Sequence, residues 1–250
     1  MKDAIQRGHI VEVVESALTH PTHSDGFVDS GDAVLVGVLT GVAVDSAAAA
    51  TDLVRVAVAG AVSLSCSAHT ASANSAIAVG DKLYYEDSDT KAVGTLTSDA
   101  TAPTDGDTVT IGSTVYVFKD TLSVGPAVPF EVLVGISAAV ALDNLKSAIN
   151  LTAGEGTTYA TGTTIHPTVN ATTNGATTQV VEANTAGPAG NLIATTEVGT
   201  HTSWGATTLV TGSLIGTPSK DSAKTAFGIA LGALTSGANG VIPVKLKRTF

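Results

Sequence analysis

The segment Gly31–Val36 reads GDAVLV, and the segment Gly80–Tyr85 reads GDKLYY. In both, the Gly-Asp pair is typical of a turn, because glycine tolerates unusual backbone angles and the aspartate side chain bonds to nearby backbone. The apolar residues that follow are typical of a strand. The first segment continues at position 41 with Gly41–Val44 (GVAV), whereas the matching continuation of the second, Gly228–Leu231 (GIAL), starts only at position 228. We interpret the two segments as copies of one small β meander, the second of which is interrupted by an insertion.

Each copy ends in a strand with period-2 alternation. The valines of Leu53–Val58 fall on one face of the first strand. In the strand Val241–Leu246, Ile242, Val244 and Leu246 face one way, and Lys245 and Lys247 face the other. Pro243 lacks an amide donor, so we expect the second strand to lie at a sheet edge or next to a bulge.

The composition favours a β protein and argues against several functions. The chain has 250 residues, 44% of them hydrophobic and only 4% aromatic, with 26 glycines. Small and β-branched residues with abundant glycine suit sheets better than helix bundles. The 12 basic and 22 acidic residues give a net charge of −10, which speaks against a nucleic-acid binder because phosphate contacts need a basic face. One cysteine excludes an intramolecular disulfide and a multi-thiolate zinc site.

No targeting or membrane segment is expected. Residues 1–7 lack the apolar core of a signal peptide, and no apolar run is long enough to span a bilayer. We therefore expect a soluble protein, made in the cytoplasm, with no membrane partner.

The region 98–218 has its own character, rich in threonine, glycine and alanine. Thr108–Phe118, with Gly-Ser at its centre, predicts a β-hairpin, and Phe130–Val134 predicts another strand. Asn174–Gly175 between threonine-rich runs is a two-residue hairpin signal.

One helix is expected, from about Ser137 to Asn150, with Ser137 as its N-cap. Its helical periodicity assigns an apolar face and a polar face. The apolar face consists of Leu142, Leu145 and Ile149, and the polar face of Asp143, Asn144, Lys146 and Ser147.

These observations predict a mainly β fold in three parts. Residues 1–30 form a polar N-terminal arm, which could add a strand to a partner's sheet. Residues 31–97 and 219–250 together form one discontinuous module, a small β-barrel or β-sandwich. Residues 98–218 form an inserted, independently folded β-rich domain with one α-helix.

Three acidic or histidine-containing loops resemble metal sites. His20 and His23, with Asp25 nearby, lack an obvious third ligand, and zinc sites need three or four protein ligands. Glu86–Asp89 resembles the start of a calcium loop, but Thr-Lys follows and the pattern fails. The same holds for Asp105–Asp107. Solvated turns are the preferred interpretation of all three, and we predict no metal site.

No catalytic or cofactor motif stands out either. Gly187–Asn191 is glycine-rich but lacks the Lys-Ser/Thr of a phosphate loop, so we interpret it as a turn. Cys66 shares a strand face with Val62 and Leu64 and is expected to be a small buried hydrophobe rather than a nucleophile. No Gly-x-Ser-x-Gly elbow occurs. We therefore predict no catalytic and no cofactor-binding residues, and we do not expect an enzyme.

The outer module resembles the capsid cement, or head decoration, proteins of tailed bacteriophages. The resemblance rests on Gly31–Val36, Gly41–Ala43, Gly80–Tyr85 and Gly228–Leu231, with the closing strand Val241–Leu246. It covers about half of the chain, and its motifs are turns and core positions rather than chemistry. The long insertion departs from the family pattern; it resembles β-rich modules of other phage virion proteins, most of all in Val109–Phe118 and Leu142–Asn150.

The resemblance implies a structural virion protein, made in the host cytoplasm, that binds the outer surface of an assembled capsid. It implies a homotrimer that clamps neighbouring major capsid proteins, with residues 1–30 reaching a capsid subunit and the insertion projecting outward. No cofactor is implied.

Two other functions remain open. The insertion could be the binding domain of a host-surface or glycan-binding adhesin, for which Trp204 and a few tyrosines offer sugar-stacking surfaces. A small hydrolase is the third reading. Neither has a positive motif.

Overall fold

The computed structural model describes residues 10–124 and 128–247, which form two compact units. Unit 1 comprises the described residues of Met1–Thr90, Ala186–Ala189 and Thr211–Phe250. Unit 2 comprises those of Lys91–Thr185 and Gly190–Val210. The prediction of a mainly β fold with one α-helix is confirmed.

The first sheet of unit 1 is antiparallel, with strand order β1-β4-β3-β2. Its strands are β1 (Ile10–Val14), β2 (Ala33–Val36), β3 (Leu39–Ala43) and β4 (Leu53–Ala57). A short 3-10 helix, η1 (Glu15–Ala17), follows β1. Both faces of β2 and β3 are covered, which explains their nearly continuous apolar sequences.

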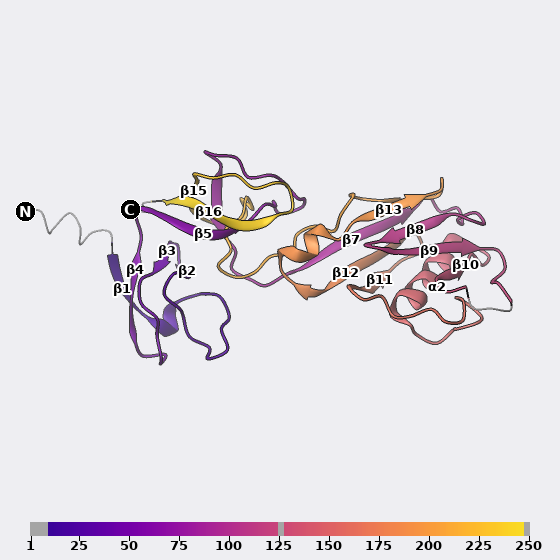
Figure 1. Ribbon diagram of the computed structural model, residues 1–250, viewed down its shortest axis with the longest axis horizontal. Helices are drawn as coiled ribbons and strands as arrows, with labels where there is room; N and C mark the ends of the chain where they lie inside the picture. Colours follow the sequence, from indigo (N-terminus) through magenta and orange to yellow (C-terminus); the bar gives the residue numbers. More distant parts are fainter. Residues whose placement is uncertain (1–9, 125–127, 248–250) are drawn as a thin grey trace, which may run out of the picture. The chain divides into compact units, whose positions relative to one another are not determined.

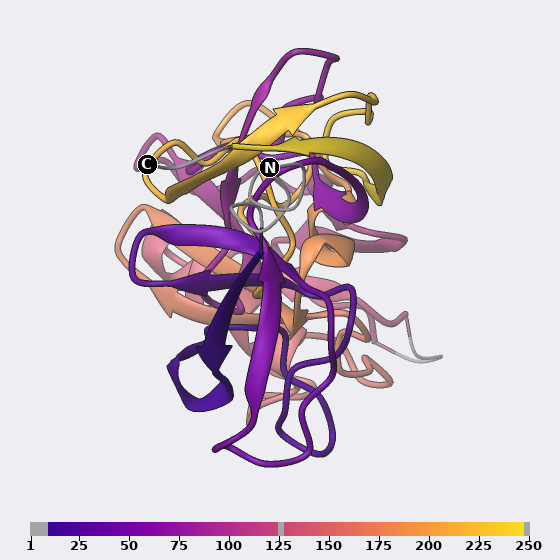
Figure 2. The same cartoon turned by 90° about the vertical axis from the view of Figure 1, so that its left-hand side faces the viewer.

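The second sheet of unit 1 joins two distant parts of the chain in the order β5-β16-β15-β6. Its strands are β5 (Ala61–Ser67), β6 (Lys82–Tyr85), β15 (Thr225–Ala230) and β16 (Asn239–Leu246). The last strand, β16, pairs with β5 from Asn239 opposite Ser67 to Lys245 opposite Ala61. Figures 1 and 2 show the yellow β16 beside the purple β5. The closing part of the chain therefore completes a sheet that the opening part begins.

The two sheets of unit 1 share a core. It contains Leu35 and Val42 from the first sheet and Leu64, Leu83 and Val244 from the second, among others. A second cluster on the other face of the first sheet contains the alternating valines of β4, as the sequence predicts, together with Val28.

Pro243 does not lie in an edge strand, because β16 is central between β5 and β15. The prediction of an edge position is therefore wrong. Leu231 donates its N–H to the Pro243 oxygen, and the strand β15 has already ended at Ala230. The position at which Pro243 lacks an N–H is therefore opposite a residue beyond the end of β15. The sheet loses few backbone hydrogen bonds there.

Unit 2 contains two sheets and the helix. One sheet has the order β10-β9-β8-β13 and the other the order β11-β12-β7-β14. The strands are β7 (Lys91–Ser98), β8 (Thr108–Ile111), β9 (Thr114–Lys119), β10 (Glu131–Leu133), β11 (Val169–Asn174), β12 (Thr178–Ala186), β13 (Thr195–Val198) and β14 (Thr202–Trp204). A 3-10 helix, η2, spans Pro188–Leu192. The predicted hairpin at 108–118 is confirmed as β8 and β9.

The helix α2 (Ala138–Asn150) begins where the sequence predicts, and the Ser137 hydroxyl accepts the Val140 N–H at 3.3 Å. The predicted apolar face is buried. Asn144, which we assigned to the polar face, is buried as well, and its amide donates to the Leu133 oxygen at 2.8 Å. A buried polar side chain is stable there because the carbonyl of β10 is its partner.

The boundaries in the structure differ from those expected. Residues 91–97 belong to unit 2 and residues 211–218 to unit 1. Of the expected arm 1–30, residues 1–9 lie outside the described residues, whereas residues 10–30 are part of unit 1. Their strand β1 pairs with β4, and Val28 is fully buried. Among the described residues, no helix combines the length and apolarity needed to cross a membrane.

Candidate functional site

The two histidines of the first loop are engaged with carboxylates. His20 Nε2 lies 3.0 Å from Glu15 Oε1, and His23 Nε2 lies 2.7 Å from Asp32 Oδ2. The hydrogen bond to Asp32 raises the pKa of His23. Asp25 accepts the N–H of Phe27, and its negative charge also contributes to the raised pKa of His23. The imidazoles therefore tie the loop to η1 and to the residue just before β2.

The segment Glu86–Asp89 holds unit 1 together after β6. Glu86 is 2% exposed and accepts the hydroxyl of Ser219, while His69 Nε2 lies 3.6 Å from Glu86 Oε1. Burial raises the pKa of Glu86. Asp87 pairs with Lys224 at 2.5 Å. The sequence pattern did not reveal that this turn carries a buried carboxylate.

The remaining motifs also have structural roles. Asp105 pairs with Lys119 at 2.8 Å, and Asp107 accepts the Thr104 N–H. At Gly190, within Gly187–Asn191, a Cβ would lie 2.7 Å from that of Ala92. This glycine lets two segments of unit 2 approach closely.

Cys66 is fully buried, as expected, and burial raises the pKa of its thiol to about 12. In residues 10–124 and 128–247, no group of three or more His, Cys, Asp or Glu side chains could hold a metal ion.

Trp204 borders a shallow hollow of about 420 Å³ in unit 2, lined also by Thr195–Glu197 and Gly205–Thr207. Its Nε1 donates to the Thr196 oxygen at 3.2 Å, and its ring packs partly against the core of the unit. Hydroxyl groups and the Glu197 carboxylate surround the hollow.

The second sheet of unit 1 carries a more distinctive site on its solvent face. Ile229 of β15 stands opposite Lys82 of β6 on one side and opposite Lys245 of β16 on the other. The three side chains form one row across the sheet, because residues directly opposite in neighbouring strands point to the same face. All three are exposed.

A second row lies two residues further along the outer strands. Tyr84 stands opposite Ala226, and Lys247 donates its N–H to the Phe227 oxygen. Between the rows, β15 contains one residue more than β6, since the register shifts between Ala226 and Gly228. Such a bulge bends and twists the strand locally.

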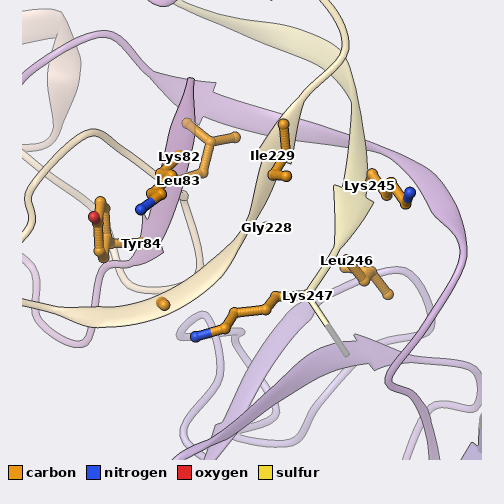
Figure 3. A pocket seen from close by; sticks show the side chains of 9 residues that line it. Lys82, Leu83, Tyr84, Gly228, Ile229, Lys245, Leu246 and Lys247 are labelled. Carbon is orange, nitrogen blue, oxygen red and sulfur yellow. The ribbon is translucent and has the colours of Figure 1, made fainter. Parts of the chain in front are cut away.

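The bulge and two small residues leave a hollow of about 640 Å³ between the rows. We call it the basic hollow; it is lined by Lys82, Leu83, Tyr84, Ala226, Gly228, Ile229, Lys245, Leu246 and Lys247. In Figure 3, Lys82, Tyr84 and Lys247 lie on one side of Gly228 and Lys245 lies on the other.

The charges of the basic hollow are uncompensated within the described residues. Five other basic side chains each lie within 4.0 Å of an Asp or Glu oxygen: Arg55, Lys91, Lys119, Lys220 and Lys224. Among the described residues, no Asp or Glu oxygen lies within 4.0 Å of the ammonium group of Lys82, Lys245 or Lys247. Lys146 is the other described basic residue without an acidic partner. Three ammonium groups therefore surround one hollow of a chain whose net charge is −10.

Chemically, the basic hollow can bind carboxylates and aliphatic groups, and nothing in it resembles a nucleophile–base pair. Sequence reasoning placed Lys245 and Lys247 on the outer face but did not assign them a role, and it missed Lys82. The sequence feature that could have revealed this site is the GDKLYY segment together with its displaced continuation at Gly228–Leu231. The two form neighbouring strands, and their pairing brings the lysines into one sheet.

Comparison with protein families gives one match. The family described as phage cement protein matches residues 11–115. The matched stretch begins inside β1 and ends inside β9, so it includes β2 to β6 of unit 1 and continues past the Thr90–Lys91 boundary. No curated protein and no solved structure matches the chain.

The match includes three of the segments that support the resemblance on sequence: Gly31–Val36, Gly41–Ala43 and Gly80–Tyr85. It spans the first sheet from the second residue of β1 onward, together with two strands of the second sheet, β5 and β6. It does not reach β15 and β16, which complete the second sheet, and it leaves most of unit 2 uncovered. Over residues 11–115, the chain is similar to the phage cement proteins, a family that suggests a structural role on a phage capsid.

Proposed function

We propose that the protein binds the outer surface of an assembled phage capsid and stabilises it by clamping neighbouring major capsid proteins. The family match over residues 11–115 carries this proposal. A protein that binds only the expanded shell stabilises that state by mass action, without catalysis. The proposal includes synthesis in the host cytoplasm and no enzymatic activity.

The free edge of the first sheet supports the clamping contact. Among the described residues, β1 pairs only with β4, so its other edge offers backbone donors and acceptors to a partner strand. Beside this edge, Ile10, Val14 and Leu53 are 42%, 39% and 63% exposed. Val14 stands opposite Leu53 in the register, so apolar surface and free backbone adjoin.

The active form in this proposal is a homotrimer, because three linked binding surfaces raise the effective concentration at each contact after the first. Unit 2, which contains most of the predicted insertion 98–218, projects outward from the shell. In this proposal residues 1–9 contribute to binding a capsid subunit.

The test uses expanded capsid shells that lack the protein, mixed with the full chain. We expect the chain to co-sediment with expanded shells, to bind unexpanded shells less, and to raise the temperature at which the expanded shells disassemble. Light scattering of the free protein should give the mass of three chains. If the chain fails to co-sediment, or binds without changing shell stability, the proposed function is wrong.

A variant without residues 1–9 tests the arm separately. Deleting residues 1–25 would also remove β1 and so disrupt the first sheet. We expect the shorter deletion to weaken shell binding while leaving the fold intact; unchanged occupancy would contradict a role for the arm.

Glycan binding by unit 2 is the second candidate function, favoured by the hollow beside Trp204. Tryptophan faces and hydroxyl groups suit sugar rings because each sugar has apolar and polar faces. A glycan array probed with the full chain tests it. We expect Glu197→Gln to reduce any specific signal, and an array without signal contradicts this candidate.

A further inference from the structure

The basic hollow has the features of a protein-docking surface. Its row Lys82–Ile229–Lys245 places an aliphatic side chain between two ammonium groups, and Lys247 adds a third. We infer that the basic hollow binds an acidic segment of the capsid shell, in which carboxylates flank an aliphatic side chain. This inference rests on the proposed function, since it names the part of the partner that this surface recognises.

Charge complementarity is the first argument. Other described basic groups of unit 1 are matched by carboxylates of the same chain: Arg55 by Asp45, Lys220 by Asp81 and Lys224 by Asp87. The lysines of the basic hollow are unmatched among the described residues although the chain carries 22 acidic residues. Charged groups at an interface are arranged to meet opposite charges on the partner, which improves association rate and specificity.

The apolar surface next to the lysines is the second argument. Ile229 is 42% exposed, and Leu231 and Val241 are 43% and 70% exposed. Leu231 bonds through its N–H to the Pro243 oxygen, so it continues the same face beside β16. An apolar centre with charged side chains at its rim is the usual composition of a protein interface.

The arrangement of the lysines distinguishes this ligand from a single small anion. Lys82 and Lys245 are separated by the whole of β15, and neighbouring strands lie about 4.8 Å apart. In Figure 3 the Lys245 side chain extends away from Lys82 rather than toward it. Charges spread on both sides of Ile229 suit several carboxylates along a segment better than one phosphate.

Nucleic acid fits the surface poorly. The net charge of −10 repels a polyanion at long range, and binding driven by phosphate contacts requires many cations. Tyr84 is the one aromatic residue among the lining residues, so the hollow offers little stacking for bases.

The test replaces the three lysines and measures binding of the full chain to expanded shells. In the first variant, Lys82, Lys245 and Lys247 are all changed to Glu; in the second, all three are changed to Gln, which removes charge without adding repulsion. The matched control changes Lys91, Lys119 and Lys146 of unit 2 to Glu, so its net charge equals that of the first variant. The control replaces two surface ion pairs, Lys91–Glu182 and Lys119–Asp105, by pairs of carboxylates at partly exposed positions, where charge interactions contribute little to stability. Circular dichroism and thermal unfolding confirm that each variant is folded.

We expect the Glu variant to bind shells about ten- to a hundredfold more weakly than the wild type, the Gln variant to lose less, and the control to change by less than about threefold. Raising NaCl from about 0.05 to about 0.5 M should weaken the wild type and have little effect on the Gln variant. Ile229→Ser should weaken binding too. Val38→Ser, at a site that is 76% exposed in the turn between β2 and β3, serves as its control.

The outcomes separate the two claims. If the wild type does not bind shells, the proposed function fails and this inference fails with it. If the wild type binds and both lysine variants bind equally well, the proposed function stands and the inference is overturned. It is also overturned if the lysine variants lose binding to duplex DNA or lose self-association while their shell binding is unchanged, because the occupant is then nucleic acid or a second copy of the chain.

Discussion

At the scale of single residues, Gly228 shows how tightly the second sheet of unit 1 is built. A Cβ at this position would lie 2.5 Å from the Lys245 backbone oxygen and 2.9 Å from Val244 Cγ1. Because backbone atoms cannot move aside as a side-chain tip can, we expect Gly228→Ala to lower the free energy of unfolding by roughly 1–3 kcal/mol. Chemical denaturation measures the change.

The control for this substitution is Gly240→Ala on β16 of the same sheet. A Cβ there would meet Cδ2 of Leu234 at 2.8 Å, the far end of a flexible side chain. We expect a clearly smaller loss, so equal losses in the two variants would contradict the explanation.

Glu86 gives unit 1 a pH dependence. Burial raises the pKa of this carboxyl above its unfolded value, so the folded state favours the protonated form. Its contribution to stability is complete below the unfolded pKa and is lost as the pH rises through the folded pKa. Glu86→Gln stays neutral and can still accept the Ser219 hydroxyl. We therefore expect the variant to gain stability relative to the wild type as the pH rises from about 4 to about 7, measured by calorimetry.

The neighbouring carboxyl provides a control with the opposite sign. The hydrogen bond from Lys224 lowers the pKa of Asp87, so its stabilising contribution is present above the unfolded pKa and is lost as the pH falls. Asp87→Asn should thus lose stability relative to the wild type as the pH rises over the same range. Parallel trends in the two variants would show that the environments assigned to them are wrong.

At the scale of elements, local sequence signals predicted what local physics determines. The hairpin β8–β9 and the helix α2 follow from turn residues, alternation and an N-cap that lie within a few positions of each other. The edge prediction for Pro243 and the exposed position for Asn144 failed because each depends on a partner elsewhere: the end of β15 in one case and the Leu133 carbonyl in the other. The strand β1 was likewise assigned to an arm, because its pairing with β4 lies about forty residues further along the chain.

The N-cap of α2 offers a test at this scale. The Ser137 hydroxyl accepts the Val140 N–H at 3.3 Å, and Ser137→Ala removes this acceptor. We expect a loss of about 1 kcal/mol in the stability of unit 2 and none in that of unit 1, followed by thermal unfolding. Ser137→Asp restores a good cap and should restore stability. An alanine variant as stable as the wild type would show that the cap contributes nothing.

At the scale of the whole molecule, the basic hollow could not be predicted from local pattern, because Lys82 and Lys245 become neighbours of Ile229 only after the closing strands join the second sheet. The repeated segments did contain this information: the displaced continuation of GDKLYY forms β15, which pairs with β6. The pattern thus predicted the pairing of distant strands, while the charges that the pairing brings together became visible only in the structure.

The same pairing predicts that unit 1 folds without most of the chain between its parts. The Thr90 N–H donates to the Ser213 oxygen at 2.9 Å, and the Thr90 hydroxyl donates to the Thr211 oxygen, so the two ends that flank residues 91–210 lie side by side. Joining Thr90 to Thr211 through two or three glycines therefore spans a short gap and removes only Ala186–Ala189 from unit 1.

We expect this shortened chain to unfold cooperatively, because it keeps both sheets and their shared core, and to bind expanded shells within about threefold of the full chain, because the free edge of β1 and the basic hollow remain. Circular dichroism, thermal unfolding and co-sedimentation measure the two properties separately. A folded chain that no longer binds would assign the capsid contact to unit 2. A chain that fails to fold would show that the two sheets depend on the segment between them, since no other part of their core has been removed.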